Sequence, residues 1–147
     1  MLKLIATIGL PGSGKSTWAR EQMLGREDTV CHAGRDALRI AHGFRRLGTP
    51  AQEAIVTAAQ DAMIIASFQH GYTTVIVDDT NLRSTCRLQQ LAYTCGAEFT
   101  VKDFRGVPLE TCIERDAARP AGERVGEHVI RAMYDSLGEQ DRAKVTA

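Results

Sequence analysis

Residues 9–16 have the types and spacing needed to bind a chain of phosphates. Their sequence, Gly-Leu-Pro-Gly-Ser-Gly-Lys-Ser, satisfies the P-loop pattern G-x-x-x-x-G-K-[ST] in full. Glycines let the backbone turn and aim several N–H groups at one anion. The pattern predicts that Lys15 contacts the β- and γ-phosphates of ATP and that the Ser16 hydroxyl ligates Mg²⁺. We expect the nucleotide to be bound by Gly9, Pro11, Gly12, Ser13, Gly14, Lys15, Ser16 and Thr17.

Two acidic residues follow a hydrophobic run further along the chain. The run is residues 75–77 and the acids are Asp78 and Asp79, which is the Walker B arrangement. A carboxylate in this position holds Mg²⁺, directly or through water, or hydrogen-bonds Ser16. Acids often follow buried strands, so the pattern has weight only because a P-loop precedes it. Either acid could serve the metal.

Asp36 is a candidate for the general base. An ATPase or a kinase needs a group that accepts the proton of its nucleophile, and Asp36 follows the second predicted strand, at the same edge as the P-loop. Asp is also a favoured N-cap of helices. The spacing alone therefore leaves two interpretations, a base and a helix cap.

The elements that would position these groups alternate between strand and helix. The strand patterns lie at 3–8, 29–32, 73–77 and 99–104. The helical patterns lie at about 15–24, 36–47, 49–71, 84–96, 108–120 and 129–137. Such alternation implies right-handed βαβ crossovers. We expect an α/β fold, the P-loop NTPase three-layer sandwich, with a central parallel sheet of about four to five strands flanked by helices. Ligands of such a sheet lie at the carboxyl ends of its strands, where the candidate residues fall.

The helix expected after Thr49 has the clearest pattern in the chain. Residues 49–52 form a capping box with Pro50 at the first helical position, and Gly71 ends the helix. Apolar residues at helical spacing predict one buried face. They are Ala51, Ile55, Ala58, Ala62 and Ile65.

The composition of the chain limits its function. Its 147 residues fit one domain, 1–147. Lys+Arg and Asp+Glu are 18 each, so no overall basic field attracts nucleic acid. The balanced charge is still compatible with an enzyme that binds only the end of a strand.

No apolar run approaches the roughly 20 residues that span a bilayer, so we expect no membrane partner. The four cysteines form no C-x-x-C pair, which favours small apolar residues of a protein in the reducing cytoplasm. The histidines have no metal-ligand spacing, so we assign them no metal.

The order of these motifs resembles the 5′-kinase domain of bacteriophage polynucleotide kinase. The similarity begins with residues 7–20 and continues with an R-D-x-x-R pattern at 35–39 and an Asp-Thr-Asn-Leu block at 79–82. It returns at Arg115 and Arg119 and over 125–134, so that it covers nearly the whole chain in order.

The resemblance implies an activity and roles for several residues. The enzyme would transfer the γ-phosphate of ATP, with Mg²⁺, to the 5′-hydroxyl end of DNA or RNA. Asp36 would be the general base, Lys15 and Arg119 would also be catalytic, and Arg39 would hold the 3′-phosphate of the terminal nucleotide.

A lid near 115–125 is the second implication of the resemblance. Arg119, with Arg115, would lie over the bound nucleotide and stabilise charge on the transferring phosphoryl group. Thr80 and Val125 would pack on the acceptor base, and Asn81 would also bind the substrate. Without the resemblance, these arginines would be interpreted as a solvated helix face.

Two other functions are compatible with a P-loop. A kinase of a small molecule (a nucleoside, nucleotide, sugar or antibiotic) shares the motifs described and suits the balanced charge. A GTPase-like switch also has a P-loop, but it is disfavoured because no N-K-x-D motif occurs and no D-x-x-G follows residues 75–77.

Overall fold

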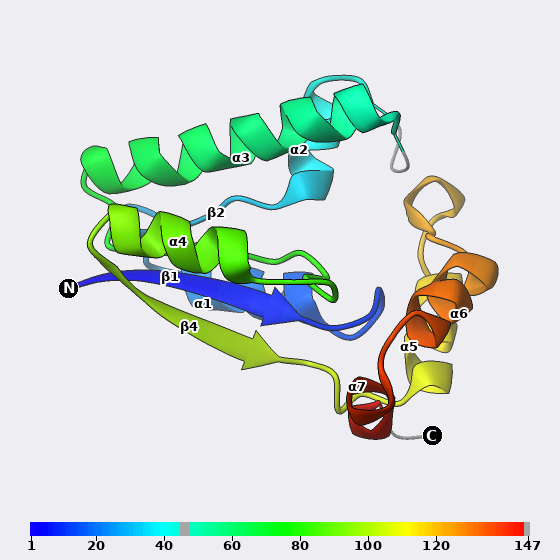
Figure 1. The fold of residues 1–147 in the computed structure, drawn as a ribbon. Coiled ribbons are helices and arrows are strands. Elements are labelled where there is room, and N and C mark those ends of the chain that lie inside the picture. Colours follow the sequence, from blue (N-terminus) through cyan, green and yellow to red (C-terminus); the bar gives the residue numbers. More distant parts are fainter. Residues whose placement is uncertain (45–47, 146–147) are drawn as a thin grey trace.

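Four parallel strands in the order β2-β3-β1-β4 form the central sheet of the computed structural model (Figure 1). The structure describes residues 1–44 and 48–145. The strands are β1 (Leu2–Ile8), β2 (Val30–His32), β3 (Thr74–Val77) and β4 (Ala97–Asp103). β1 lies inside the sheet, in parallel register with β3 on one side and β4 on the other. The α/β class and the parallel sheet predicted from the sequence are confirmed.

Helices cover both faces of this sheet. α1 (Lys15–Met23) lies on one face, and α3 (Pro50–Gln69) and α4 (Cys86–Thr94) lie on the other (Figure 1). Side chains of a strand point alternately to opposite faces. Leu4 and Val75 accordingly pack in the cluster under α3 and α4, whereas Ile76 packs with Ala19 of α1. The result is the three-layer sandwich.

The last part of the chain gathers beyond the carboxyl ends of β1 and β4 (Figure 1). It contains α5 (Leu109–Ala117), the 3-10 turn η1 (Ala121–Glu123), α6 (Glu127–Asp135) and α7 (Glu139–Lys144). These helices share a small core to which Leu10 of the P-loop also belongs. The phosphate loop is therefore packed against the C-terminal helices. No helix within the described ranges is long and apolar enough to cross a membrane.

α2 is shorter than its sequence pattern predicted. The expected helix covered 36–47, whereas α2 spans Arg35–Ala41. Gly43 has a φ of +71°, in the left-handed region that ends helices. Residues 45–47 of the predicted helix lie outside the described part of the chain.

The capping box of α3 is confirmed, but its predicted buried face was wrong. The backbone N–H of Gln52 donates to the Thr49 hydroxyl at 3.2 Å, and the Gln52 side chain accepts from the Thr49 N–H at 2.9 Å. Ile55 of the predicted stripe is 48% exposed. The residues of α3 that are buried are Val56, Gln60 and Ile64. An apolar pattern could not find this face because a polar residue, Gln60, stands at its centre.

Candidate active site

The P-loop has a backbone that glycine alone adopts easily. Gly12 and Gly14 have φ angles of +82° and +99°. A Cβ on Gly12 would also collide with the carbonyl oxygen of Cys112 in α5. Both glycines are thus required where the loop turns into α1, which begins at Lys15. The first N–H groups of a helix have no partner within it and favour anions.

Lys15 lies folded against this loop. Its side chain is almost fully buried, and its Nζ donates to the carbonyl oxygen of Leu10 at 2.6 Å and to Oγ of Ser13 at 3.3 Å. Burial lowers the pKa of Lys15 from 10.5 to about 8. A compact cation with so little solvation gains strongly from a neighbouring polyanion. The position suits a chain of phosphates.

The structure distinguishes the two Walker B acids. The Asp78 carboxylate is 7% exposed, and its Oδ1 lies 3.3 Å from Nε2 of His32. Burial alone would raise the pKa of Asp78, but the hydrogen bonds from His32 and from the Ser16 hydroxyl lower it. Asp78 and Ser16 thus place two oxygen atoms together, and oxygen ligands are what Mg²⁺ prefers. The residues present fit the expected metal.

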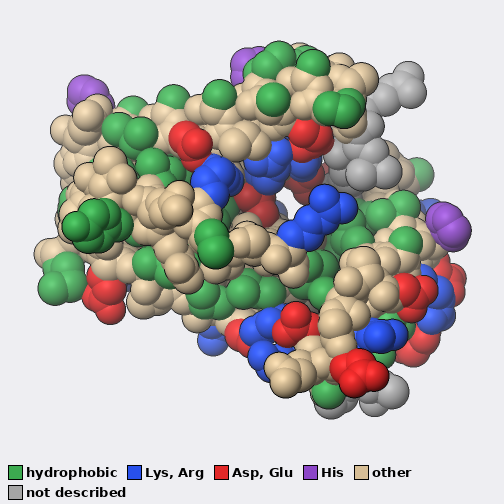
Figure 2. All heavy atoms as spheres, viewed as in Figure 1, with side chains coloured by type: hydrophobic (Ala, Val, Ile, Leu, Met, Phe, Trp, Pro, Cys, Tyr) green, Lys and Arg blue, Asp and Glu red, His purple; other side chains and the backbone are tan. Residues whose placement is uncertain are grey.

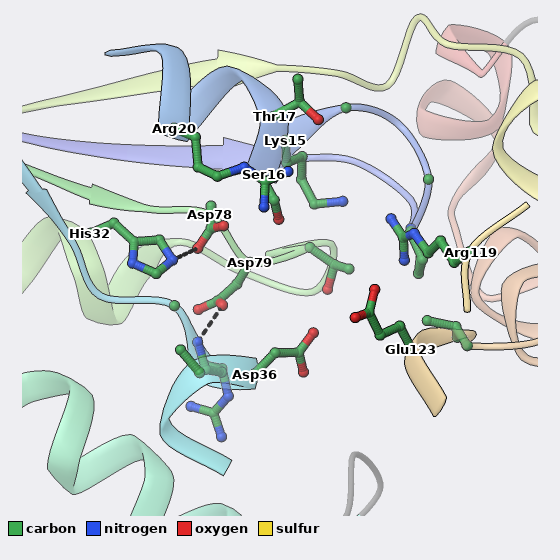
Figure 3. A pocket seen from close by; sticks show the side chains of 18 of the residues that line it. Lys15, Ser16, Thr17, Arg20, His32, Asp36, Asp78, Asp79, Arg119 and Glu123 are labelled. Carbon is green, nitrogen blue, oxygen red and sulfur yellow. Dashed lines mark hydrogen bonds and ion pairs between the residues drawn. The ribbon is translucent and has the colours of Figure 1, made fainter. Parts of the chain in front are cut away.

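Asp79 is used differently. Its Oδ1 accepts the backbone N–H of Arg35 at 2.7 Å, and its Oδ2 accepts from Nε2 of Gln60 at 2.7 Å. Burial raises the pKa of Asp79. Both oxygens of Asp79 are therefore committed to the protein, and one of them holds the first residue of α2 (Figure 3).

α2 carries the candidate base and its arginine neighbours. Asp36 lies in the first turn, and the N-cap of the helix is Gly34, with no side-chain capping hydrogen bond. The helix-cap interpretation of Asp36 is therefore not supported. Arg39 donates from NH1 to Oδ1 of Asp36 at 2.8 Å. This ion pair orients the Asp36 carboxylate.

Glu53 of α3 is a residue that the sequence did not single out. It accepts from Nε and NH2 of Arg39 at 3.0 and 2.8 Å and from NH2 of Arg35 at 2.7 Å. Hydrogen bonds from Arg39, and then from Arg35, lower the pKa of Glu53 from 4.5 to about 2. In the sequence Glu53 is simply an acid in the first turn of a helix, where acids are common. Its partners lie 14 and 18 residues away.

The dependence of stability on pH is expected to reveal what Glu53 contributes to the free energy of unfolding. A carboxyl group with a lowered folded pKa stabilises the protein above its unfolded pKa of 4.5, and this stability is lost as the pH falls toward about 2. Since the group is partly exposed, we expect a loss of about 1–2 kcal/mol. In urea titrations between about pH 5 and pH 3, Glu53→Gln should lose correspondingly less unfolding free energy than the wild type. Glu21→Gln, at an exposed position of α1, is the control, and parallel curves for wild type and Glu53→Gln would contradict this role.

A buried acid organises the segment that follows α5. Asp116 is 2% exposed and accepts the backbone N–H groups of Val125 and Gly126, both at 2.9 Å. It also lies 3.4 Å from NH1 of Arg119. Asp116 thereby closes the loop that carries Arg119, a role that no sequence pattern indicated. Arg115 lies beside the P-loop, with NH1 3.5 Å from the carbonyl oxygen of Gly12.

These elements enclose a cleft of about 1010 Å³. Figure 2 shows Lys and Arg side chains gathered around a hollow on this face. In Figure 3, Lys15 and Arg119 face each other across the cleft, and Asp36 points into it from α2. The residues selected from the sequence that line the cleft are Pro11, Gly12, Gly14, Lys15, Ser16, Thr17, Asp36, Arg39, Asp78, Asp79, Thr80, Arg119 and Val125.

The remaining selected residues do not line the cleft. They are Gly9, Ser13, Arg115 and Asn81. Asn81 has a φ of +48°, and its Nδ2 donates to the carbonyl oxygens of Thr7 at 2.8 Å and Asp79 at 3.4 Å. It therefore ties the loop after β3 to β1. The cleft also includes residues that the sequence did not indicate, among them Arg20, His32 and Glu123.

Comparison with known proteins places this geometry in context. The family model described as AAA domain matches residues 4–139. A chain of the Pnkp1/Rnl/Hen1 complex is 34% identical over 78% of this chain and 39% of its own length, with a TM-score of 0.64. A chain of the Pnkp1/Rnl/Hen1 RNA repair complex is 27% identical over 97% of this chain and 46% of its own, with a TM-score of 0.78. The protein thus spans less than half of the length of either chain.

Two more distant structures share the fold alone. The Mycobacterium tuberculosis APS kinase CysC in complex with AMPPNP and APS is 19% identical over 80% of this chain and 69% of its own, with a TM-score of 0.57. A gluconokinase from Sinorhizobium meliloti is 16% identical over 99% of this chain and 80% of its own, with a TM-score of 0.59. These matches confirm the expected P-loop kinase fold, and the resemblance inferred from the sequence agrees with the first two.

Proposed function

Since the chain belongs to the AAA domain family and has the fold of a P-loop kinase, we propose that it transfers the γ-phosphoryl group of ATP to the 5′-hydroxyl end of a polynucleotide. The observation that carries the proposal is that α2 presents Asp36 and Arg39 to the same cleft as the P-loop. Similarity at 34% and 27% identity to chains of an RNA repair complex supports a nucleic-acid acceptor.

One side of the cleft would bind the phosphate chain of the donor, ATP. The turn at Gly12 and Gly14 and the first N–H groups of α1 would hold the phosphate chain, with Lys15 beside it. Ser16 and Asp78 would hold Mg²⁺. When bound, the ion neutralises charge on the β- and γ-phosphates.

The acceptor side is built around α2. Asp36 would accept the proton of the 5′-hydroxyl. The oxygen of that hydroxyl would attack the γ-phosphorus while the bond from this phosphorus to the β–γ bridging oxygen breaks, so that ADP leaves. Arg39 would bind the phosphate next to the terminal nucleoside. Its three contacts with Asp36 and Glu53 use only part of the five N–H donors of a guanidinium group. The other N–H groups of Arg39 make no hydrogen bond to residues 1–44 or 48–145, and they would bind a phosphodiester.

A lid near 115–125 would complete the site. Arg119 lines the cleft opposite Lys15 (Figure 3), and Asp116 fixes the loop on which it stands. Phosphoryl transfer depends mainly on positioning and on stabilising charge. We propose that Arg119 provides charge to the transferring group.

One experiment separates the polynucleotide acceptor from a small molecule. The protein is incubated with γ-labelled ATP and Mg²⁺ and with parallel acceptors, namely 5′-hydroxyl RNA, 5′-hydroxyl DNA, nucleosides and sugars. Label is expected on the oligonucleotides. The same oligonucleotides with a 5′-phosphate are the control and should stay unlabelled. Label on a nucleoside or sugar alone would support the small-molecule kinase, whose fold the distant neighbours share.

A further inference from the structure

Gln60 is a fully buried polar residue in the middle of α3, behind the cleft. Its side chain has no exposed surface. Nε2 donates to the backbone carbonyl of Ala33 at 2.6 Å and to Oδ2 of Asp79 at 2.7 Å. Oε1 accepts from NH2 of Arg87, in α4, at 2.6 Å. Every polar atom of this amide therefore has a partner, as buried polar groups require.

The three contacts dictate the type of residue at position 60. Two acceptors, a carbonyl and a carboxylate, face one end of the side chain, and the guanidinium of Arg87 faces the other. An amide offers two donors on its nitrogen and an acceptor on its oxygen. A carboxylate would bring a second acceptor toward Asp79, and an apolar side chain would make none of these three hydrogen bonds. The site is specific for glutamine.

Gln60 holds the entry to α2 from two sides. Ala33 and Arg35 flank Gly34, the N-cap of α2. Gln60 binds the carbonyl of Ala33 directly and reaches the N–H of Arg35 through Asp79. Figure 3 shows the bond between Asp79 and the backbone at the start of α2, next to Asp36. At Gly34 itself a Cβ would collide with Oδ1 of Asp78, so the Asp78 carboxylate packs directly against the backbone at the entry to α2.

We propose that Gln60 is a positioning residue for phosphoryl transfer, which fixes the first turn of α2 and thereby the place of Asp36 relative to the P-loop. Gln60 touches neither substrate, since it does not line the cleft. The proposal rests on the proposed role of Asp36. A displacement of about 1 Å in a reacting group can cost about 100-fold in rate.

The test compares Gln60→Met with Val56→Ala. Methionine keeps the length and volume of glutamine but makes none of its strong hydrogen bonds. Val56 is also fully buried on the same face of α3, so its truncation destabilises the fold without touching the polar network. Below the Tm of both variants, Gln60→Met should lower kcat on a 5′-hydroxyl oligonucleotide by about 10- to 100-fold. It should leave the KM for ATP nearly unchanged, and Val56→Ala should keep both constants.

A second measurement needs no acceptor at all. Amide hydrogen exchange of the protein without substrates is compared at Arg35 and at Ile5, a partly buried residue of β1 that packs against the core. Faster exchange at Arg35 but not at Ile5 in Gln60→Met would support the positioning role, because global destabilisation raises both.

The outcomes separate this inference from the proposed function. Gln60→Met with wild-type kcat and wild-type exchange at Arg35 would overturn the positioning role. Equal losses of kcat in Gln60→Met and Val56→Ala would also overturn it. A wild-type protein that labels no oligonucleotide would contradict the proposed function, and exchange at Arg35 would then still decide whether Gln60 holds α2.

Discussion

Asp36→Asn is expected to lower the rate of phosphoryl transfer to a 5′-hydroxyl end by about 10³-fold, within the range of a lost general base. Asparagine has nearly the same shape, and its oxygen can still accept from Arg39, which lies 2.8 Å from Asp36 in the wild type. What the variant loses is the ability to take a proton. Asp36 is exposed, so the fold should be unaffected.

Single-turnover transfer from labelled ATP measures the effect, and calorimetry measures ATP binding. Affinity for ATP should stay within about twofold of the wild type, since the side chain belongs to the acceptor side. Asp28→Asn, at an exposed position before β2, is the matched control. Near-normal turnover of Asp36→Asn would show that another group accepts the proton.

Lys15→Met is expected to weaken ATP binding and to lower turnover, with a combined effect of about 10³-fold or more. One unit of charge at about 4 Å from a phosphate corresponds to roughly 4 kcal/mol at the effective dielectric of a protein surface. Methionine preserves the length of the side chain. It removes the cation that lies against the Leu10 carbonyl.

A thermal-shift assay separates this loss from a folding defect. Saturating ATP and Mg²⁺ should raise the Tm of the wild type by several degrees, because a ligand at about 100 times its Kd adds roughly 2.7 kcal/mol. The Lys15→Met protein should show little shift. Without nucleotide its Tm should equal or exceed that of the wild type, since burial of the lysine ammonium is unfavourable, as its lowered pKa indicates. Lys3→Met, at an exposed position of β1, is the control, and an undiminished ATP shift in Lys15→Met would contradict the role.

The parts of the fold predicted correctly are those encoded by local patterns. Strand and helix periodicity, the P-loop and the capping box at Thr49 each involve residues close together in the sequence. Predictions that needed a helix face or a helix end to be located were less accurate. The stripe through Ile55 was wrong because the buried face of α3 is centred on the polar Gln60. α2 ended early, at Ala41, before a glycine in the left-handed region.

The sequence by itself determined that a P-loop lies at residues 9–16, after the first strand of an α/β sandwich, because a P-loop is a continuous segment whose pattern is complete in its own residues. Only the tertiary structure decided how Asp78 and Asp79 differ. Asp78 lies beside Ser16 and His32. Asp79 accepts hydrogen bonds from the backbone N–H of Arg35, at the start of α2, and from the side chain of Gln60, in α3. Adjacent acids look alike in a sequence. Their tasks are set by partners 19 to 62 residues away, from Gln60 beside Asp79 to Ser16 beside Asp78, that the fold brings within hydrogen-bonding distance.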